Sequence, residues 1–304
     1  MVLLDLHYHA LPSFEDYWIN RCGYAGKNIL EEIMGQCASK NIQVCAITSD
    51  SGSNYELIKH TPHDRFGFLL NEALRSGNLK HEKIGENILE IKRNSHTAYI
   101  LNSQTIKVYQ DGRFYDILTL GTNKVPNNKN WDETFKFLQD NNLPVIAEHA
   151  LCTDHNGIGL DLLIKFSDSK KLTAIEHNSQ LCLPNFLFSQ LPILKYYAKN
   201  RNIKAKEIAD KYRIPYIATS DGNVIEHLGI SSISIRQSAF DPAKIKNENE
   251  FLQKLVHAIQ MYDFKSEENY SSVKDFFKFA WMIIGEEYML GAKKRWEKKN
   301  LESG

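Results

Sequence analysis

Two histidines near the start of the chain, His7 and His9, have the residue type and the spacing of a metal-binding pair. They follow Val2-Leu3-Leu4, a short apolar run that predicts a first β-strand. Side chains at positions i and i+2 of a strand point to the same face, so the two imidazoles would point together. Neutral imidazole is the commonest metal ligand in proteins. The pair therefore indicates half of a metal site, although two hydrogen-bonded histidines in an N-terminal strand would give the same short pattern.

Polar residues also follow the later apolar runs that predict strands. In parallel α/β folds the carboxyl ends of the strands meet at one edge, and active sites lie there. Buried histidine and aspartate side chains are costly unless they are paired or bound to a metal. We therefore expect one polar site at this edge, built from Ser49 and Asp50 after 42–48, Gln104 after 98–101, Glu148 and His149 after 145–147, Glu176 and Asn178 after 172–175, and Ser220, Asp221 and Asn223 after 216–219. His177 also follows 172–175, but by strand alternation it would point to the opposite face.

Helix-like segments alternate with these strands and predict a parallel sheet, either open or closed into a barrel. They cover 28–40, 130–141, 185–201 and 204–212, and the first has Ile29, Leu30, Ile33, Met34 and Cys37 on one face. Residues 105–109 and 114–120 predict a hairpin, because Asp111-Gly112 between them suits a two-residue turn.

The remaining segments predict additions to the barrel. Residues 51–97 are polar with weak periodicity and predict an insertion with one or two helices. From about Phe240 onward the pattern is helical only, and a last helix capped by Ser272 and Asp275 would run to about Lys298. We expect a barrel domain at 1–240 and a C-terminal helical extension, packed on the barrel, at 241–304.

Composition restricts the classes of partner. The 304 residues include 37 Lys+Arg and 37 Asp+Glu, so the formal net charge of zero does not favour broad electrostatic capture of nucleic acid. We expect no membrane span, because no apolar run is long enough, and no signal peptide. The five cysteines form no CxxC pair, which is typical of reduced thiols. These features predict a cytoplasmic protein and leave its oligomeric state open.

The strand-end motifs together resemble the PHP (polymerase and histidinol phosphatase) domain family over roughly residues 1–235. The resemblance implies a distorted (β/α)7 TIM-like barrel of α/β class that holds up to three metal ions. The segments that carry it are Asp5-Leu6-His7-Tyr8-His9-Ala10, Ala46-Ile47-Thr48-Ser49-Asp50, Val145-Ile146-Ala147-Glu148-His149, Ile175-Glu176-His177-Asn178-Ser179, and Ser220-Asp221-Gly222-Asn223 with Gly229 in register.

The resemblance also implies a set of ligands, several of which are substituted here. His7, His9, His149 and Asp221 match the family, while an amide, Gln104, stands where the family has a bridging glutamate. Oxygen ligands suit Mn, Mg or Fe better than Zn, or the multinuclear site has decayed. We expect one tightly bound divalent ion (Mn, Fe or Zn). The candidate metal ligands are His7, His9, Glu15, Asp50, His149 and Asp221, and the candidate lining residues are Gln104, Asn123, Glu176, Asn178 and Asn223.

The implied activity is metal-dependent hydrolysis of a phosphoester in a small phosphorylated metabolite or nucleotide. Asp50, His149 or Glu15 would transfer the proton. No motif places a phosphate-binding cation, and the candidates are Arg21, Lys27, Arg65 and Arg236. Three alternatives stay open: a degenerate PHP domain that binds a ligand or partner without hydrolysis, an RNA-associated barrel similar to a ribonuclease P protein subunit, and a TatD-like nuclease barrel, which also begins with HxH. The register from Ser220 to Gly229 favours PHP over the last.

Overall fold

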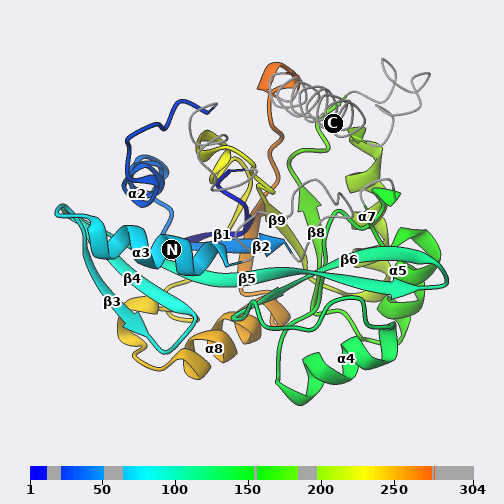
Figure 1. The fold of residues 1–304 in the computed structure, drawn as a ribbon. Helices are drawn as coiled ribbons and strands as arrows, with labels where there is room; N and C mark the ends of the chain where they lie inside the picture. Colours follow the sequence, from blue (N-terminus) through cyan, green and yellow to red (C-terminus); the bar gives the residue numbers. More distant parts are fainter. Residues whose placement is uncertain (12–21, 51–63, 154–155, 184–196, 276, 278–304) are drawn as a thin grey trace, which may run out of the picture.

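The structure, a computed structural model, describes residues 1–11, 22–50, 64–153, 156–183, 197–275 and 277. In these residues eleven strands form one sheet, in the order β11-β10-β1-β2-β5-β6-β7-β8-β9, with the hairpin β3–β4 attached to β5 (Figure 1). The strands are β1 (Val2–Tyr8), β2 (Val44–Asp50), β3 (Lys80–Ile84), β4 (Ile88–Arg93), β5 (His96–Gln110), β6 (Arg113–Leu120), β7 (Ile146–Ala147), β8 (Ala174–Asn178), β9 (Tyr216–Thr219), β10 (Ser232–Ile235) and β11 (Phe264–Glu267).

The sheet curls into a nearly closed barrel, because the chain after β9 returns to β1. The backbone N–H of Asp221 donates to the carbonyl of His7 at 2.8 Å, and that of His9 donates to the carbonyl of Gly222 at 2.9 Å. β1, β2 and β5 are parallel neighbours, as are β7, β8 and β9. β6 and β10 run antiparallel to their neighbours, which distorts the regular barrel. The expected α/β TIM-like barrel is confirmed.

Alternate residues of the strands face the barrel interior and pass from apolar to polar toward the mouth. The apolar layer includes Leu6, Ala46, Leu101, Ile146, Ala174 and Ile217. Two positions further along, the strands carry Thr48, Ser103, Glu148, Glu176 and Thr219, all buried. Helix α8 (Glu248–Gln260) adds Phe251 and Leu255 to the same apolar cluster. A polar layer therefore lies over an apolar one, at the carboxyl ends of the parallel strands.

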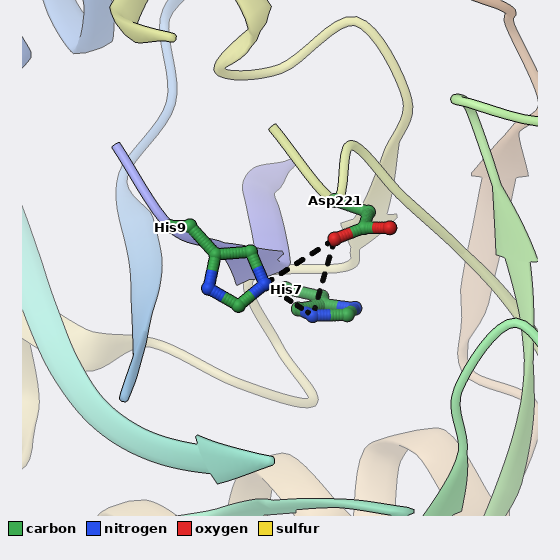
Figure 2. Close-up of side chains that lie close together, drawn as sticks. All are labelled: His7, His9 and Asp221. Carbon is green, nitrogen blue, oxygen red and sulfur yellow. Dashed lines mark hydrogen bonds and ion pairs between the residues drawn. The ribbon is translucent and has the colours of Figure 1, made fainter. Parts of the chain in front are cut away.

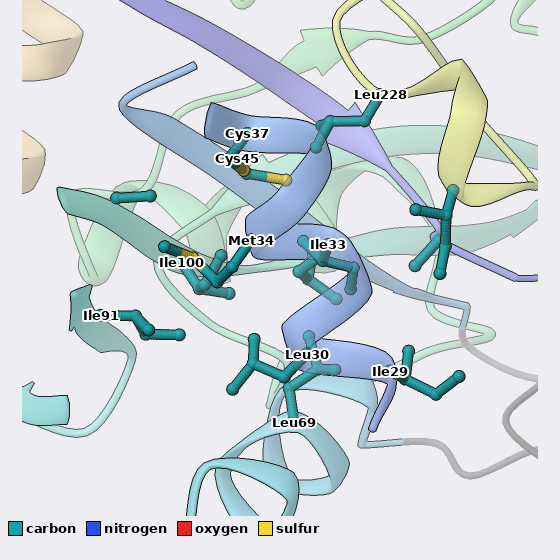
Figure 3. Packing of buried hydrophobic residues seen from close by; sticks show 14 of the residues in the cluster. Ile29, Leu30, Ile33, Met34, Cys37, Cys45, Leu69, Ile91, Ile100 and Leu228 are labelled. Atoms are coloured by element: carbon teal, nitrogen blue, oxygen red, sulfur yellow. The ribbon is translucent and has the colours of Figure 1, made fainter. Parts of the chain in front are cut away.

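Helices cover the outside of the barrel. The helix predicted at 28–40 is α2 (Ile29–Lys40), and its predicted apolar face is buried. Figure 3 shows this face packed with Leu69, Ile91, Ile100 and Leu228. Truncation of a buried leucine such as Leu30 to alanine typically costs about 2–5 kcal/mol. The other outer helices are α3 (Arg65–Arg75), α4 (Trp131–Asp140), α5 (Gly159–Asp168) and α7 (Asn200–Tyr212), and the short 3₁₀ helices are η3 (Ile225–His227) and η4 (Pro242–Lys244).

The turns and helix caps predicted from neighbouring residues are confirmed. The hairpin turn has positive φ at both Asp111 (53°) and Gly112 (77°), the conformation that a two-residue turn of this type requires. The runs at 98–101 and 105–109 are parts of one strand, β5. Asn130 and Glu133 form the expected capping box of α4. Asp275 N donates to Ser272 Oγ at 3.0 Å, while most of the predicted last helix lies outside the described residues.

Three predictions of secondary structure were wrong or incomplete. The insertion at 51–97 contains helix α3 but also the hairpin β3–β4, and its residues 51–63 lie outside the description. The region after Phe240 is not helical only, because β11 pairs antiparallel with β10. The break expected between two helices near 201–204 is absent, since α7 runs through it; residues 184–196 are not described. β11 is short and depends on pairing with β10, which lies some distance back along the chain, and local pattern does not reveal such pairing. β3 and β4 pair locally with each other and with β5, but their charged residues hid the alternation.

Candidate metal centre

Three side chains meet at the mouth of the barrel: His7 from β1, His9 from the residue just after β1, and Asp221 from the loop after β9 (Figure 2). The Nε2 atoms of the two histidines lie 3.1 Å apart. Asp221 Oδ1 lies 3.4 Å from His7 Nε2 and 3.3 Å from His9 Nε2. His7 and His9 are buried. Two imidazoles and one carboxylate therefore turn a single triangular set of donor atoms toward one point.

Hydrogen-bond partners behind the two imidazoles orient both rings. His7 Nδ1 lies 2.5 Å from Glu176 Oε1, and His9 Nδ1 lies 3.1 Å from the carbonyl oxygen of Thr48. When each acceptor takes an Nδ1–H, a neutral ring presents the lone pair of its Nε2 toward Asp221. A histidine that binds a metal commonly donates its other N–H to a carboxylate or carbonyl in this way. The arrangement therefore orients both rings so that their Nε2 atoms can bind a metal.

A β-bulge turns the histidines into the mouth. The register between β1 and β2 shifts between Asp5 and Tyr8. Leu6 belongs to the interior cluster, whereas Tyr8, two positions later, packs outside with α2. Unbroken alternation from Leu6 would direct His7 outward and Tyr8 inward. The extra residue of a bulge re-aims side chains, so His7 and His9 reach the interior face.

Asp221 is fixed from three directions. Asn178 Nδ2 donates to its Oδ2 at 2.7 Å, and its own N–H is bound to His7. The preceding residue and Gly229 both donate backbone N–H groups to the buried carboxylate of Asp5, at 3.1 and 2.8 Å. Asp221 has a φ of 45°, in the left-handed region that non-glycine residues rarely adopt. Backbone strain of this kind is typical of functional sites.

The spacing of the three donor atoms fits a divalent ion. A cation with nitrogen and oxygen ligands at about 2.0–2.2 Å, and angles between tetrahedral and octahedral, separates neighbouring ligand atoms by about 2.9–3.5 Å. The three separations here are 3.1, 3.3 and 3.4 Å. The donor set of two imidazoles and one carboxylate also suits Mn, Fe or Zn.

The charges around the centre favour a cation. Burial lowers the pKa of His7, but the carboxylates of Glu176, Asp221 and Glu148 outweigh it and hold that pKa well above its ordinary value. Burial raises the pKa of Asp221, but the nearby histidines outweigh it and hold that pKa far below its ordinary range. The site is therefore rich in ionised carboxylate, and a bound cation would compensate it.

A second group of potential ligands, Asp116, Glu148 and His149, lies beside the first. Glu148 is placed between the groups: its Oε2 lies 3.9 Å from His7 Nε2, and its Oε1 lies 3.4 Å from His149 Nε2. Thr105 Oγ1 donates to the same carboxylate at 3.0 Å. His149 has a φ of 29°, and its buried Nδ1 has no hydrogen-bond partner within the described part of the chain. Strain thus also occurs in this second group.

The ammonium of Lys107 forms an ion pair with Asp116 of the second group. Lys107 Nζ lies 3.1 and 3.3 Å from the two carboxylate oxygens of Asp116. Burial raises the pKa of Asp116 to about 6, although Lys107 acts to lower it. Burial lowers the pKa of His149, but its hydrogen bond to Glu148 and the surrounding carboxylates raise that pKa to about 9. In the second group, the carboxylate of Asp116 is therefore already compensated by a cation of the chain itself.

The structure brings most predicted site residues together but separates others. Glu176 and Asn178 line the centre through their contacts to His7 and Asp221. Asn223 Nδ2 donates to the backbone carbonyl of Asp221 at 3.2 Å. Asp50 ends β2, but its side chain lies outside the description, as does all of Glu15.

Gln104 does not have the lining role expected of it, whereas that of Asn123 stays a prediction. Gln104 exchanges two hydrogen bonds of 2.9 Å with the backbone of Val125, so its amide faces away from the mouth. Asn123 Nδ2 donates to Asp64 Oδ1 at 2.8 Å, at the start of α3. Both expectations rested on motif position. Gln104 lies between Ser103 and Thr105 of β5, whose side chains face the barrel interior. Because side chains alternate along a strand, that of Gln104 points to the outside.

Sequence reasoning missed Thr105, Lys107 and Asp116, placed no ligand role on Glu148, and offered Arg65 only as a candidate phosphate-binding cation. The signal for the first three was present, because strand alternation and the predicted hairpin place them on the inward face. Arg65 is almost fully buried and donates to the carbonyls of His9 and Leu11, which anchors the chain just after the histidine pair. The other candidate phosphate-binding cations are engaged or undescribed: Lys27 pairs with Glu32, Arg236 pairs with Asp263, and Arg21 lies outside the description.

In the described segments, every helix is too short or too polar to cross a membrane. No family model matches the sequence, and no curated protein gives a significant match.

Solved structures resemble the fold. The crystal structure of PsfC from Pseudomonas syringae PB-5123 is 10% identical, with a TM-score of 0.53 over 95% of this chain and 98% of that one. A two-domain protein from Bacteroides vulgatus ATCC 8482, described as containing a predicted PHP-like metal-dependent phosphoesterase, is 11% identical, with a TM-score of 0.49 over 88% of this chain and 65% of that one. The second score is too low to carry an argument. The first likeness, at this identity, is one of fold alone.

Proposed function

We propose that this chain is a metal-dependent phosphoesterase of the PHP type that hydrolyses a small phosphorylated metabolite or nucleotide. The observation that carries the proposal is the convergence of His7 Nε2, His9 Nε2 and Asp221 Oδ1 within 3.1–3.4 Å of one another. These residues come from the first and last motifs of the PHP resemblance. Three protein ligands leave coordination positions open, which is the pattern of catalytic rather than structural metal sites.

His7, His9 and Asp221 would hold the ion, and Mn, Fe or Zn suits this donor set. The ion would supply an activated water and positive charge for the phosphoryl oxygens. The chain supplies orientation: Glu176 and the Thr48 carbonyl fix the imidazoles, and Asn178 fixes the carboxylate. Such fixed donors need little rearrangement during a reaction.

His149 is the described residue best placed to hold the proton for the leaving-group oxygen. Its ring lies beside Glu148, which separates it from the first centre, and its Nδ1 has no partner within the described residues. Proton transfer to a leaving group requires a positioned acid within hydrogen-bond reach of that group. Asp50 remains a second candidate because β2 ends at the mouth, opposite Thr105 of β5.

The alternative function is that of a binding module without hydrolysis. It is favoured by one observation: amides stand at the positions of Gln104 and Asn123, and both amides are engaged elsewhere. A centre with fewer charged ligands would hold fewer cations. Such a domain would still bind an anionic ligand through the first ion.

A combined assay of metal content and activity tests these proposals. Protein purified with Mn, Fe or Zn would be analysed for bound metal and screened against phosphomonoesters and phosphodiesters. We expect about one tightly bound ion per chain and turnover that chelation abolishes. Asp221→Asn keeps the shape of the side chain but removes its charge, so it should weaken both metal binding and turnover. Bound metal without turnover on any ester would support the binding module, and a chain that binds none of the three metals would reject both readings of the centre.

A further inference from the structure

Lys107 and Asp116 form an ion pair on an arm of the sheet that projects past the barrel mouth. The pairing of β5 with β2 ends at Thr105, opposite Asp50, but β5 continues to Gln110 with β6 beside it. Lys107 and Asp116 lie directly opposite each other in that hairpin. Their exposed fractions are only 9% and 6%. Charged side chains are rarely buried to this extent.

The pair faces the candidate metal centre. Lys107 shares a strand face with Thr105, whose hydroxyl donates to Glu148. Asp116, Glu148 and His149 each offer a ligand atom, and these atoms lie within 4.8 Å of one another. By spacing alone, the three would make a second cation site next to the first. Glu148, with one oxygen toward each group, would connect the two sites.

The charge of that second group is already compensated. Both carboxylate oxygens of Asp116 lie within 3.3 Å of the Lys107 ammonium. An ammonium so close to a carboxylate repels a divalent cation from that carboxylate. It also occupies the carboxylate lone pairs that would otherwise bind the cation. Desolvation of the two charges also makes a buried ion pair a weak source of stability, so stability alone is a poor account of this one.

We propose that the ammonium of Lys107 takes the place of a second metal ion: it excludes a cation from Asp116, Glu148 and His149, and it binds a phosphoryl oxygen of the substrate beside a single-ion centre. This inference rests on the proposed function of the first centre. Lysine is a common phosphate ligand and acts as a point charge. Its role would be to anchor the anion while the first centre holds the reacting group.

The test compares Lys107→Met and Lys107→Arg with the exposed-lysine control Lys129→Met. Mn bound per chain is measured by equilibrium dialysis, and the Kd of inorganic phosphate by calorimetry at a Mn concentration that fills only the first site. Wild type, Lys107→Arg and Lys129→Met should each bind one Mn. Lys107→Met should bind two, because its carboxylates are then uncompensated. Its phosphate affinity should fall at least about tenfold, whereas that of Lys107→Arg should stay within about threefold.

Asp116→Asn keeps the proposal testable if Lys107→Met does not fold, which its melting curve would show. This variant keeps the ammonium and removes a negative charge, so it should bind one Mn and bind phosphate as tightly as wild type or more tightly. A loss of phosphate affinity in Asp116→Asn of about tenfold would overturn the proposal. So would two Mn in wild type, or one Mn and unchanged phosphate affinity in Lys107→Met. A wild type that binds no metal would instead remove the proposed function of the first centre.

Discussion

Two groups of acids and histidines lie side by side at the barrel mouth, and they differ in how their charges are satisfied. In the first, the Nδ1 atoms of His7 and His9 are tied to Glu176 and to the Thr48 carbonyl, and three donor atoms converge. In the second, Asp116 is already paired with Lys107. Both groups satisfy a distance criterion for metal binding. The contrast teaches that such a criterion is insufficient, because the partners of each ligand decide whether its lone pairs are available.

The strongest test of this contrast removes ligands from each group in turn. His7→Ala or Asp221→Ala should abolish tight metal binding and lower any phosphoesterase activity at least about 10²-fold, because the first group loses a direct ligand. Asp116→Asn should retain the tight ion. Elemental analysis after gel filtration measures both. Tight metal retained in both first-group variants would mean that the ion binds elsewhere.

A substitution behind the first group would sharpen the comparison. Glu176→Gln should weaken metal affinity about 10–100-fold, since outer-shell partners orient the ligands and tune their basicity. His177→Gln is the matched control: it is the next residue of β8, but its ring faces outward and contacts the carbonyl of Asn269 at 3.1 Å. Competition with a chromophoric chelator gives both affinities. Equal affinities in the two variants would show that the Glu176 contact does not tune the centre.

The PHP resemblance places a metal-bridging glutamate at position 104, whereas in the structure Glu148 lies between the two groups. Gln104→Glu tests which of the two positions could hold the bridging carboxylate. The carboxylate would face the Val125 carbonyl to which the amide now donates, so the free energy of unfolding should fall by about 1–3 kcal/mol. The number of bound ions should not change. Urea denaturation and metal analysis provide the measurements. A gain of a second ion without loss of stability would place the bridging position at residue 104 after all.

The smallest expected effect is that of His227, a histidine away from the mouth, on how the free energy of unfolding changes with pH. Its sign should be opposite to that of His7. Burial lowers the pKa of His227 below its ordinary value. As the pH falls below about 6.5, His227 takes up a proton in the unfolded chain more readily than in the folded chain. Protonation of this residue therefore lowers the free energy of unfolding over that range. The raised pKa of His7 acts in the reverse sense.

His227→Gln should therefore lose less stability than wild type between about pH 7 and pH 5 in metal-free protein. Urea unfolding at the two pH values measures the difference. An identical decline in both proteins would mean that His227 does not titrate differently in the folded and unfolded chains.

The sequence predicted what local rules determine. The strand before His7, the buried face of α2, the hairpin turn at Asp111 and the α4 capping box all depend on neighbouring residues. Asp221 was matched to the histidines through motif order, and their convergence agrees with that expectation. The assignment of metal ligands itself remains a prediction.

Other features depend on context that motif matching ignores. The bulge in β1 lets both histidines face inward although Leu6 does as well. The outward direction of Gln104 follows from the continuity of β5, which the separate apolar runs concealed. The opposition of Lys107 and Asp116 could have been found, because a two-residue turn fixes the register of the predicted hairpin. β11 could not, since its short polar sequence is extended only through pairing with β10.

The bonds from Asp5 to Ser220 and Gly229 join positions 215 and 224 residues apart. A ribosome adds about 5–20 residues per second, so the first imidazoles emerge on the order of ten seconds or more before the late aspartate. Until then the nascent chain carries only an incomplete chelator. Binding of the proposed ion by all three ligands would therefore follow translation of nearly the whole barrel, which would couple metal loading to the last stage of assembly.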